Sequence, residues 1–304
     1  MSKLENILRT FLNMGFIATL AIALSFQLNT AYAQSPFQYE ISTGFFLSDD
    51  QDDNEVKMYS LQGRHHFSPV VTSGHPLKEA PFLERVGHFE LIFALTDFSS
   101  NAMIGADGPL YGGSVIDMQP GFPLLLSTGF AKSDLEFDPP ANADVSKDLY
   151  QLSIGFFVKD PLLVGLGYTR SETELSLSGL LSRTIQRDDY KLFTKWVHAI
   201  DLNTALNIEG TIETRQFDED GNTGSNTLLD ILAEYFFNPR TSLGIGLALN
   251  KGDDKEDEGA TLTLVTTVFL NPSFFVQFGF DKFYADNNEG LDENNFDALL
   301  SARF

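Results

Sequence analysis

Histidines are the side chains of this chain best suited to proton transfer or metal binding near neutral pH. There are five, namely His65, His66, His75, His88 and His198. His65 and His66 are neighbours in a segment that we expect to be a strand, where adjacent side chains point to opposite faces. They therefore cannot share one metal ion or one proton relay. Turn and interface positions explain the histidines better than catalysis does, so the sequence predicts no enzyme.

Neither a metal site nor a cofactor site is predicted. The chain contains no cysteine, which excludes thiolate ligands, thiolate nucleophiles and disulfides. Residues 218–222 have the composition of a calcium loop, but the glycine is at the wrong position and the closing glutamate is missing. The formal net charge of −22 also excludes nucleic acid as a partner, because that interaction needs clustered Lys and Arg.

Alternation of apolar and polar residues predicts the elements that hold the remaining polar groups. Between residues 241 and 250, Leu243, Ile245 and Leu247 are separated by Gly244 and Gly246. Side chains alternate faces in a strand, so such a segment has one apolar and one polar or small face. We predict about fourteen strands, or about twelve if a hairpin between residues 99 and 123 fails. Their expected positions are residues 37–48, 56–67, 87–98, 110–119, 122–134, 147–158, 162–175, 187–198, 202–215, 226–237, 241–250, 260–270, 273–284 and 295–304.

Two kinds of connection alternate between the predicted strands. Long acidic connections occupy residues 49–55, 134–147, 171–186, 216–225, 251–259 and 285–294. Tight connections carry turn-forming pairs such as Asp160-Pro161, Asn238-Pro239 and Asn271-Pro272. Long outer loops that alternate with short periplasmic turns are typical of an all-β, antiparallel, up-and-down transmembrane barrel. We interpret the acidic loops as solvated and self-repelling, with divalent cations bridging them to lipopolysaccharide as an alternative.

The N-terminus resembles a secretory leader. Lys3 and Arg9 precede an apolar run over about residues 11–28, and a small-x-small cleavage site follows at Ala31-Tyr32-Ala33. We therefore predict a signal peptide over residues 1–33 and a barrel over residues 34–304, with an N-terminal anchor helix as the alternative. No later stretch is apolar enough for a transmembrane helix.

The C-terminal strand predicts both location and closure. Phe296, Leu300 and Phe304 lie on its apolar face, and Leu299 is the one apolar residue on the opposite face. An outward terminal Phe resembles the signal that the barrel-assembly machinery reads in Gram-negative outer-membrane proteins. We expect this strand to pair with the first one, because a barrel in lipid cannot leave a free edge.

The polar strand faces should line the lumen, where charged side chains control which ions pass. Acidic residues outnumber basic ones there, which favours a mild preference for cations. An alternative is that these charges only brace the wall. The predicted inward residues are Glu40, Arg64, Glu90, Lys191, Lys195, Glu209, Glu213, Arg215, Asp230, Glu234, Asp281, Asp297 and Arg303.

Aromatic residues gather beside the tight connections, where they predict a girdle at the membrane–water boundary. Phe37 is also predicted to face lipid, as the first residue of the outer row of the first strand. The predicted girdle consists of Phe67, Phe157, Trp196, Tyr235, Phe236, Phe237, Phe269, Phe274 and Phe275.

One short stretch, residues 76–85 with the sequence PLKEAPFLER, resembles a P-L-x-E-A-x-F-L-x-R motif of general porins of Gram-negative bacteria. The resemblance implies passive diffusion of ions and small hydrophilic solutes across the outer membrane. General porins usually have more strands and a constriction loop inside the barrel; a shorter inward loop over residues 99–118 is the alternative here to the strand predicted at residues 110–119. The alternative function is a closed structural or adhesive barrel with acidic outer loops.

Overall fold

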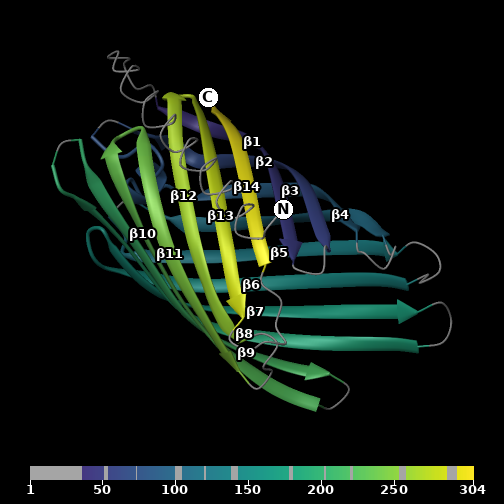
Figure 1. The fold of residues 1–304 in the computed structure, drawn as a ribbon. Helices are drawn as coiled ribbons and strands as arrows, with labels where there is room; N and C mark the ends of the chain where they lie inside the picture. The colour runs from purple at the N-terminus through teal and green to yellow at the C-terminus, as the bar shows by residue number, and fades with distance from the viewer. Residues whose placement is uncertain are drawn as a thin grey trace.

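The computed structural model describes residues 36–50, 54–72, 74–99, 105–119, 121–137, 143–177, 181–201, 203–219, 222–252, 258–285 and 293–304. The predicted leader lies outside this part of the chain. The described residues form a closed antiparallel barrel of fourteen strands, each paired with its neighbours in sequence (Figure 1). The strands are β1 (Phe37–Asp50), β2 (Glu55–Val70), β3 (His88–Ser99), β4 (Gly105–Met118), β5 (Leu124–Phe137), β6 (Ala143–Lys159), β7 (Leu162–Leu177), β8 (Leu181–Ala199), β9 (Ala205–Glu219), β10 (Asn222–Asn238), β11 (Thr241–Gly252), β12 (Gly259–Asn271), β13 (Phe274–Ala285) and β14 (Glu293–Arg303).

The barrel closes between its first and last strands, as predicted. β14 pairs antiparallel with β1, in a register that places Arg303 opposite Glu40 and Asn295 opposite Ser48. Figure 1 shows the yellow β14 beside the purple β1. Closure leaves the barrel with no unpaired edge, which a sheet surrounded by hydrocarbon requires.

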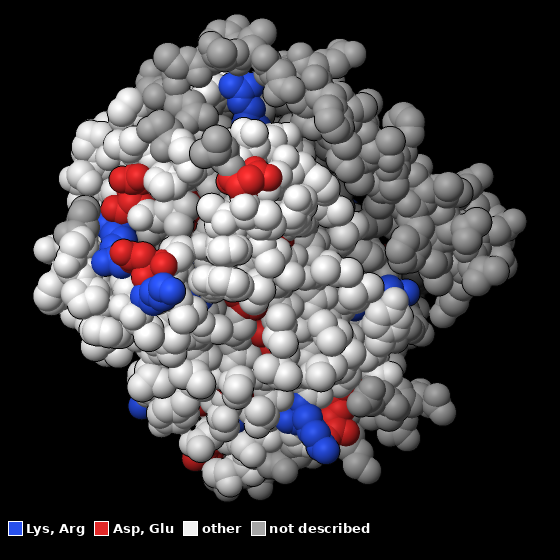
Figure 2. All heavy atoms as spheres, turned by 90° about the vertical axis from the view of Figure 1, so that its left-hand side faces the viewer, with Lys and Arg blue, Asp and Glu red and all other residues white. Residues whose placement is uncertain are grey.

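The two faces of the wall differ as the alternation predicted. On β11, Ile245 and Leu247 are exposed on the outer face, whereas Ser242 and Gly244 are buried on the inner face. Figure 2 shows one side of the molecule, where most of the described surface carries neither acidic nor basic side chains. The many exposed apolar side chains on the outer face of the strands suit contact with lipid.

Several strands are longer than predicted. The predicted loops at residues 134–147, 171–186 and 216–225 are reduced to connections at residues 138–142, 178–180 and 220–221. The prediction followed hydrophobicity, which ends where an apolar belt ends. Backbone pairing continues beyond that point between polar residues, for example between Glu172 and Gln186.

The alternative of an inward loop at residues 99–118 is wrong, because this region contributes a strand to the wall, in agreement with the strand predicted at residues 110–119. β4 pairs with both neighbours, with Tyr111 opposite Phe93 and Gly113 opposite Phe130. Its glycines weaken the alternation, and the strand begins at residue 105 instead of the predicted residue 110. A glycine is also required at position 112, since a Cβ there would lie 2.5 Å from the carbonyl oxygen of Phe130.

Residues 71–87 connect β2 to β3 at the end of the barrel where β1 begins and β14 ends, which we call the turn end. We name residues 71–72 and 74–87 the inward segment. It contains a short helix, α2 (Ala80–Leu83), and Gly74 has a φ of 84°, a conformation that glycine adopts without strain. No helix in the described part of the chain is long and apolar enough to span a membrane.

Candidate functional site

The inward segment folds into the barrel at the turn end and packs on its inner face. Leu77 is fully buried and clusters with Phe269, Phe275 and Leu299. Its amide donates a hydrogen bond of 2.8 Å to the carbonyl oxygen of Pro239, in the β10–β11 turn. Leu299, the one apolar residue on the predicted polar face of β14, therefore contacts the inward segment.

This packing corrects the predicted aromatic girdle. Phe236 is 2% exposed although the next residue, Phe237, is 42% exposed on the outer face. Adjacent side chains alternate faces, so only part of the aromatic cluster can point outward. The inward members contact the segment or the wall around it, which is a second reason for aromatics near the turns. Outward members include Phe67, Trp196, Tyr235, Phe237 and Phe274, whereas Phe157, Phe236, Phe269 and Phe275 are buried.

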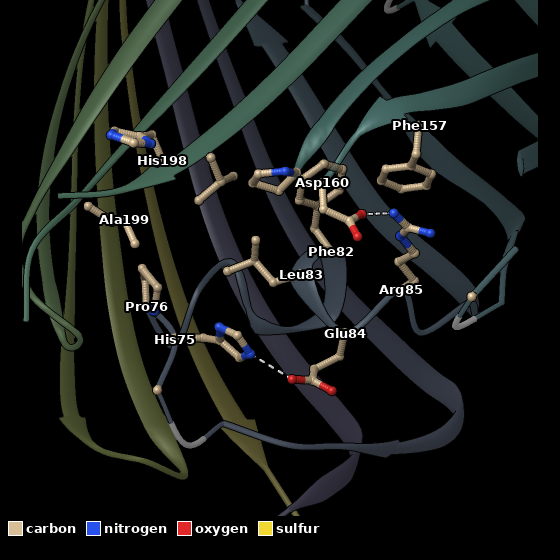
Figure 3. A pocket seen from close by; sticks show the side chains of 15 residues that line it. His75, Pro76, Phe82, Leu83, Glu84, Arg85, Phe157, Asp160, His198 and Ala199 are labelled. Atoms are coloured by element: carbon tan, nitrogen blue, oxygen red, sulfur yellow. Dashed lines mark hydrogen bonds and ion pairs between the residues drawn. The ribbon is translucent and has the colours of Figure 1, made fainter. Parts of the chain in front are cut away.

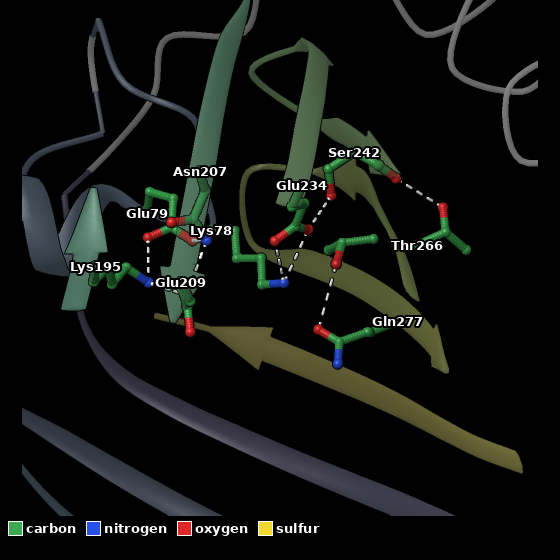
Figure 4. A network of polar contacts seen from close by, with 10 residues as sticks. Lys78, Glu79, Lys195, Asn207, Glu209, Glu234, Ser242, Thr266 and Gln277 are labelled. Carbon is green, nitrogen blue, oxygen red and sulfur yellow. Dashed lines mark hydrogen bonds and ion pairs between the residues drawn. The ribbon is translucent and has the colours of Figure 1, made fainter. Parts of the chain in front are cut away.

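An ion pair fixes the segment to β10. The Lys78 Nζ lies 2.9 and 2.8 Å from the two carboxylate oxygens of Glu234, whose side chain is 0% exposed (Figure 4). Ser242 on β11 donates a further hydrogen bond of 2.5 Å to Glu234 Oε1. A carboxylate without solvent needs such partners, because an unpaired buried charge is strongly destabilising.

A second ion pair, in which the segment supplies the anion and the wall the cation, fixes Glu79 to β8. The Glu79 Oε2 lies 2.8 Å from the Lys195 Nζ, which also lies 2.8 Å from Glu209 Oε1. Asn207 donates hydrogen bonds to Glu209 at 2.9 Å and to Glu79 at 3.4 Å. Glu79 is the N-cap residue of α2 but makes no side-chain capping bond, since its carboxylate is used by the barrel wall.

A third anchor comes from β14. The Arg303 Nη1 donates a hydrogen bond of 2.8 Å to the carbonyl oxygen of Leu77, and its Nε lies 2.6 Å from Glu40 Oε2. The guanidinium carbon lies 4.5 Å from the ring centre of Phe37. Phe37 was predicted to face lipid. An irregularity in the β1–β2 register between Phe37 and Tyr39 turns it inward instead, where it is buried.

The end of α2 is anchored at the β6–β7 turn. Arg85 has a φ of 52° and its amide bonds to the carbonyl of Phe82, so it occupies the left-handed C′ position at which glycine is usual. Its guanidinium pairs with Asp160 and lies 4.1 Å from the ring centre of Phe157 (Figure 3). These contacts offset a backbone cost of about 1–2 kcal/mol. Phe82 packs on Phe157 with ring centres 5.5 Å apart.

A cavity of about 670 Å³ lies between the inward segment and the neighbouring turns. Phe82, Leu83 and Phe157 contribute to its wall, and the pair of His75 Nε2 and Glu84 Oε1, 2.6 Å apart, lies at one side (Figure 3). The contacts described above come from β8 to β10, from β12 to β14 and from the β6–β7 turn, so the inward segment reaches across the inside of the barrel at the turn end.

Comparison with known proteins supplies a family for this architecture. A family model described as "Putative general bacterial porin" matches residues 14–304. The chain belongs to this porin family. No curated protein matches the porin in sequence. The motif at residues 76–85, which suggested general porins, is the core of the inward segment.

Solved structures show the same fold. Outer membrane protein Omp33 of Acinetobacter baumannii has 19% identity and a TM-score of 0.55, covering 90% of the porin and 100% of that chain. The Ralstonia pickettii toluene transporter TbuX has 8% identity and a TM-score of 0.50, with 89% and 90% covered. A Pseudomonas aeruginosa FadL homologue has 8% identity and a TM-score of 0.50, with 88% and 90% covered. At these identities the likeness concerns the barrel fold.

Arg64 links two of the other predicted lumen residues of the porin. It pairs with Glu90 on β3 and lies 3.4 Å from Glu40 on β1. Further along the wall, Arg215 pairs with Glu213 at 2.6 Å. Several of these groups therefore have partners on the wall itself.

The remaining acids lie on the strands that follow β9. Asp230 is on β10, Asp281 on β13 and Asp297 on β14, where the Asp297 carboxylate covers Gly279. Lys191 lies opposite Glu213 in the β8–β9 register. Sequence reasoning left out Lys147, Arg187 and Asp189 on the same faces, because their segments were predicted as loops or strand ends. Continued alternation through the polar parts of β6 and β8 was the signal that could have found them.

His65 and His66 of the porin point to opposite faces of β2, as predicted. His65 stacks on Tyr39 with ring centres 4.8 Å apart, whereas His66 is fully buried and lies 5.3 Å from the Phe37 ring. His88 lies 5.4 Å from His66. Within the described ranges, no group of three or more histidines and carboxylates could hold a metal ion.

Proposed function

We propose that the porin is an outer-membrane channel for passive diffusion of ions and small hydrophilic solutes, and that its inward segment must move to open the path. A closed barrel with charged side chains on its inner face supports a channel. The covalent connections of the inward segment to the wall are those to β2 and β3, so the segment can leave the lumen without breaking any strand pairing. The barrel family supports transport rather than catalysis.

The observation that carries the gated form of this proposal is the Lys78–Glu234 pair. It is an ionic contact between a connecting segment and the wall, and it crosses 156 residues of sequence. We expect Lys78→Met to raise the fraction of time that the purified protein conducts in planar bilayers. Wild-type protein should conduct in rarer openings. If neither protein conducts, the channel proposal is wrong.

Cation preference is the finer part of the proposal. Asp230, Asp281 and Asp297 lie on β10, β13 and β14, whereas Lys191 and Lys195 lie on β8. Charges of opposite sign on different parts of the wall create a transverse field, and an excess of acids raises the local concentration of cations. The reversal potential in a KCl gradient should show K⁺ more permeant than Cl⁻. A preference for Cl⁻ would contradict it.

The porin family and the closed barrel support a location in the bacterial outer membrane. We propose that a leader over residues 1–33 is removed and that Phe296, Leu300 and Phe304 present the assembly signal to the barrel-assembly machinery. The outer face would then contact lipid and lipopolysaccharide, with the turn end in the periplasm. When the full-length gene product is expressed, fractionation of the cell membranes should place the mature protein, without residues 1–33, in the outer membrane.

A closed structural or adhesive barrel is the second candidate, and the inward segment is the observation in its favour. Phe37 on β1 packs against Ala80 of that segment, and Arg303 on β14 donates a hydrogen bond to its Leu77 carbonyl oxygen. Under this hypothesis neither wild type nor Lys78→Met would conduct. Folded protein without conductance, with unchanged mobility of the folded form on gels, would support the closed barrel.

A further inference from the structure

The two ion pairs of the inward segment have opposite directions. Lys78 presents an ammonium to Glu234 on β10, and Glu79 presents a carboxylate to Lys195 on β8. β9 lies between these two strands, so the wall offers an anionic group on β10 and a cationic group on β8, with one strand between them. The pair of neighbouring residues on the segment is therefore a dipole bound to a complementary dipole of the wall (Figure 4).

The wall groups are oriented by partners that do not belong to the segment. Ser242 holds Glu234 with a hydrogen bond of 2.5 Å. Glu209 holds Lys195 at 2.8 Å, and Asn207 bonds to Glu209 at 2.9 Å while its own buried Oδ1 has no hydrogen-bond partner. The two halves of the site therefore keep their positions when the segment leaves. Orientation in advance lowers the cost of binding a new partner.

We propose that Glu234 and Lys195 form a binding subsite for solutes that carry both an ammonium and a carboxylate, and that such solutes compete with Lys78 and Glu79 for it. The subsite rests on the proposed function, because a solute reaches it when the segment moves. The ligand class is that of short peptides whose two charges are as far apart as in a Lys-Glu dipeptide. A solute of this class would displace the inward segment and thereby promote its own passage.

At the two charged residues, displacement replaces one set of ion pairs with a similar set, so the remaining cost comes from contacts such as the burial of Leu77. Buried ion pairs lose much of their attraction to desolvation, so the segment is not held by the full Coulomb energy of its contacts. A free solute loses translational freedom that the tethered segment does not lose. We therefore expect an effect at roughly millimolar solute concentrations.

Single-cysteine labelling tests the proposal directly, because the natural chain has no cysteine. Ala80 belongs to the segment and is fully buried against Phe37 and Val70, so the thiol of Ala80→Cys should react with a maleimide when the segment is displaced. The probes are N-acetyl dipeptide amides of similar size: Lys-Glu with both charges, Lys-Gln with one cation, Gln-Glu with one anion and Gln-Gln with none. We expect Lys-Glu to raise the labelling rate at least about threefold over Gln-Gln.

Variants separate the subsite from general effects. Glu234→Gln should abolish the advantage of Lys-Glu over Gln-Glu, and Lys195→Gln should abolish its advantage over Lys-Gln. Lys57→Gln removes a charge from an exposed pair with Glu55 and should keep the full response. A folded Ala80→Cys protein is verified by the mobility of its unheated form on gels. Leu83→Cys, at the cavity wall, provides a second labelling position.

The outcomes distinguish this inference from the channel proposal. Equal labelling rates with Lys-Glu and Gln-Gln, at both cysteine positions and with normal conductance in KCl, would overturn the subsite and leave the channel. A selective response to Lys-Glu without conductance in wild type and Lys78→Met would support the subsite and contradict the channel. Liposome swelling faster in Lys-Glu than in Gln-Gln would support both.

Discussion

Lys78 and Glu234 form a buried ion pair that joins the inward segment to the far wall of the barrel. The Lys78 Nζ is within 2.9 Å of both Glu234 oxygens, and the carboxylate is 0% exposed. Such a carboxylate is costly without a cation, so this pair is one of the contacts that fix the position of the segment, beside the Glu79–Lys195 pair and the Arg303 hydrogen bond to Leu77. The position of the segment inside the barrel is therefore set by contacts that can be removed one group at a time.

Glu234→Gln should make the segment accessible to trypsin at Lys78. The amide can still accept the Ser242 hydrogen bond but no longer attracts the ammonium. A loss of about 1–3 kcal/mol corresponds to a displaced population that is roughly fivefold to 150-fold larger. The rate of cleavage after Lys78, followed by mass spectrometry of folded protein, measures this. Lys57→Gln is the matched control, and equal cleavage rates in all three proteins would contradict the role of the pair.

Phe82→Ala should loosen the segment through packing instead of charge. Phe82 packs against the cluster of Met118, Leu125, Phe157 and Leu163. Truncating a partly buried Phe should cost about 2 kcal/mol, less than for a full core site. Single-channel recordings should show a larger open fraction. Phe67→Ala removes an exposed outer ring instead, so gating that changes equally in both variants would argue against this packing role.

Arg303→Met should destabilise the barrel seam. Glu40 would lose its partner at 2.6 Å and keep only Arg64 at 3.4 Å, which leaves a buried carboxylate poorly paired. We expect a loss of roughly 3 kcal/mol in the free energy of unfolding. Adding Glu40→Gln should restore part of it. The temperature at which the folded band disappears on gels provides the measurement, and a double variant weaker than Arg303→Met would refute the explanation.

Deleting Phe304 should impair assembly and leave ion selectivity unchanged. The Phe304 carbonyl accepts hydrogen bonds from the amides of Gln38 at 3.0 Å and Tyr39 at 2.8 Å, and its ring stacks on Tyr39. The residue lies at the seam and outside the lumen. The folded fraction in outer membranes should fall several-fold, whereas Phe304→Tyr should assemble. Normal assembly of the truncated chain would show that the terminal Phe is dispensable.

Asp201 should give the β8–β9 turn a pH-dependent stability. The backbone amides of Asn203 and Thr204 donate hydrogen bonds of 2.7 and 2.9 Å to its Oδ1, and these bonds lower the carboxyl pKa below its usual 3.8. A lowered pKa means that the stabilisation is complete well above pH 3.8 and disappears as the pH falls through the folded-state value. Asp201→Ala should therefore melt earlier than wild type at pH 7, with the difference vanishing in strong acid. A constant difference across this range would contradict the assignment.

The sequence by itself determined the barrel. Alternation such as Leu243, Ile245 and Leu247 against Gly244 and Gly246 specifies strands and their two faces, because a strand has a side-chain period of two. Acidic and turn-forming connections specify an up-and-down order. The pairing of the terminal strand with the first follows because an open edge is not tolerated in lipid.

Only the tertiary structure decided what occupies the lumen. Lys78 and Glu234 are distant in sequence, and no local period connects them; they meet because the closed barrel brings β10 opposite the β2–β3 connection. Leu299 looked like an exception to the pattern for the same reason, since it packs against the cluster of Leu77, Phe269 and Phe275. Phe236 was predicted to point outward in the girdle but is buried. Local propensity determines which face a side chain points to, whereas closure of the barrel determines what it meets there.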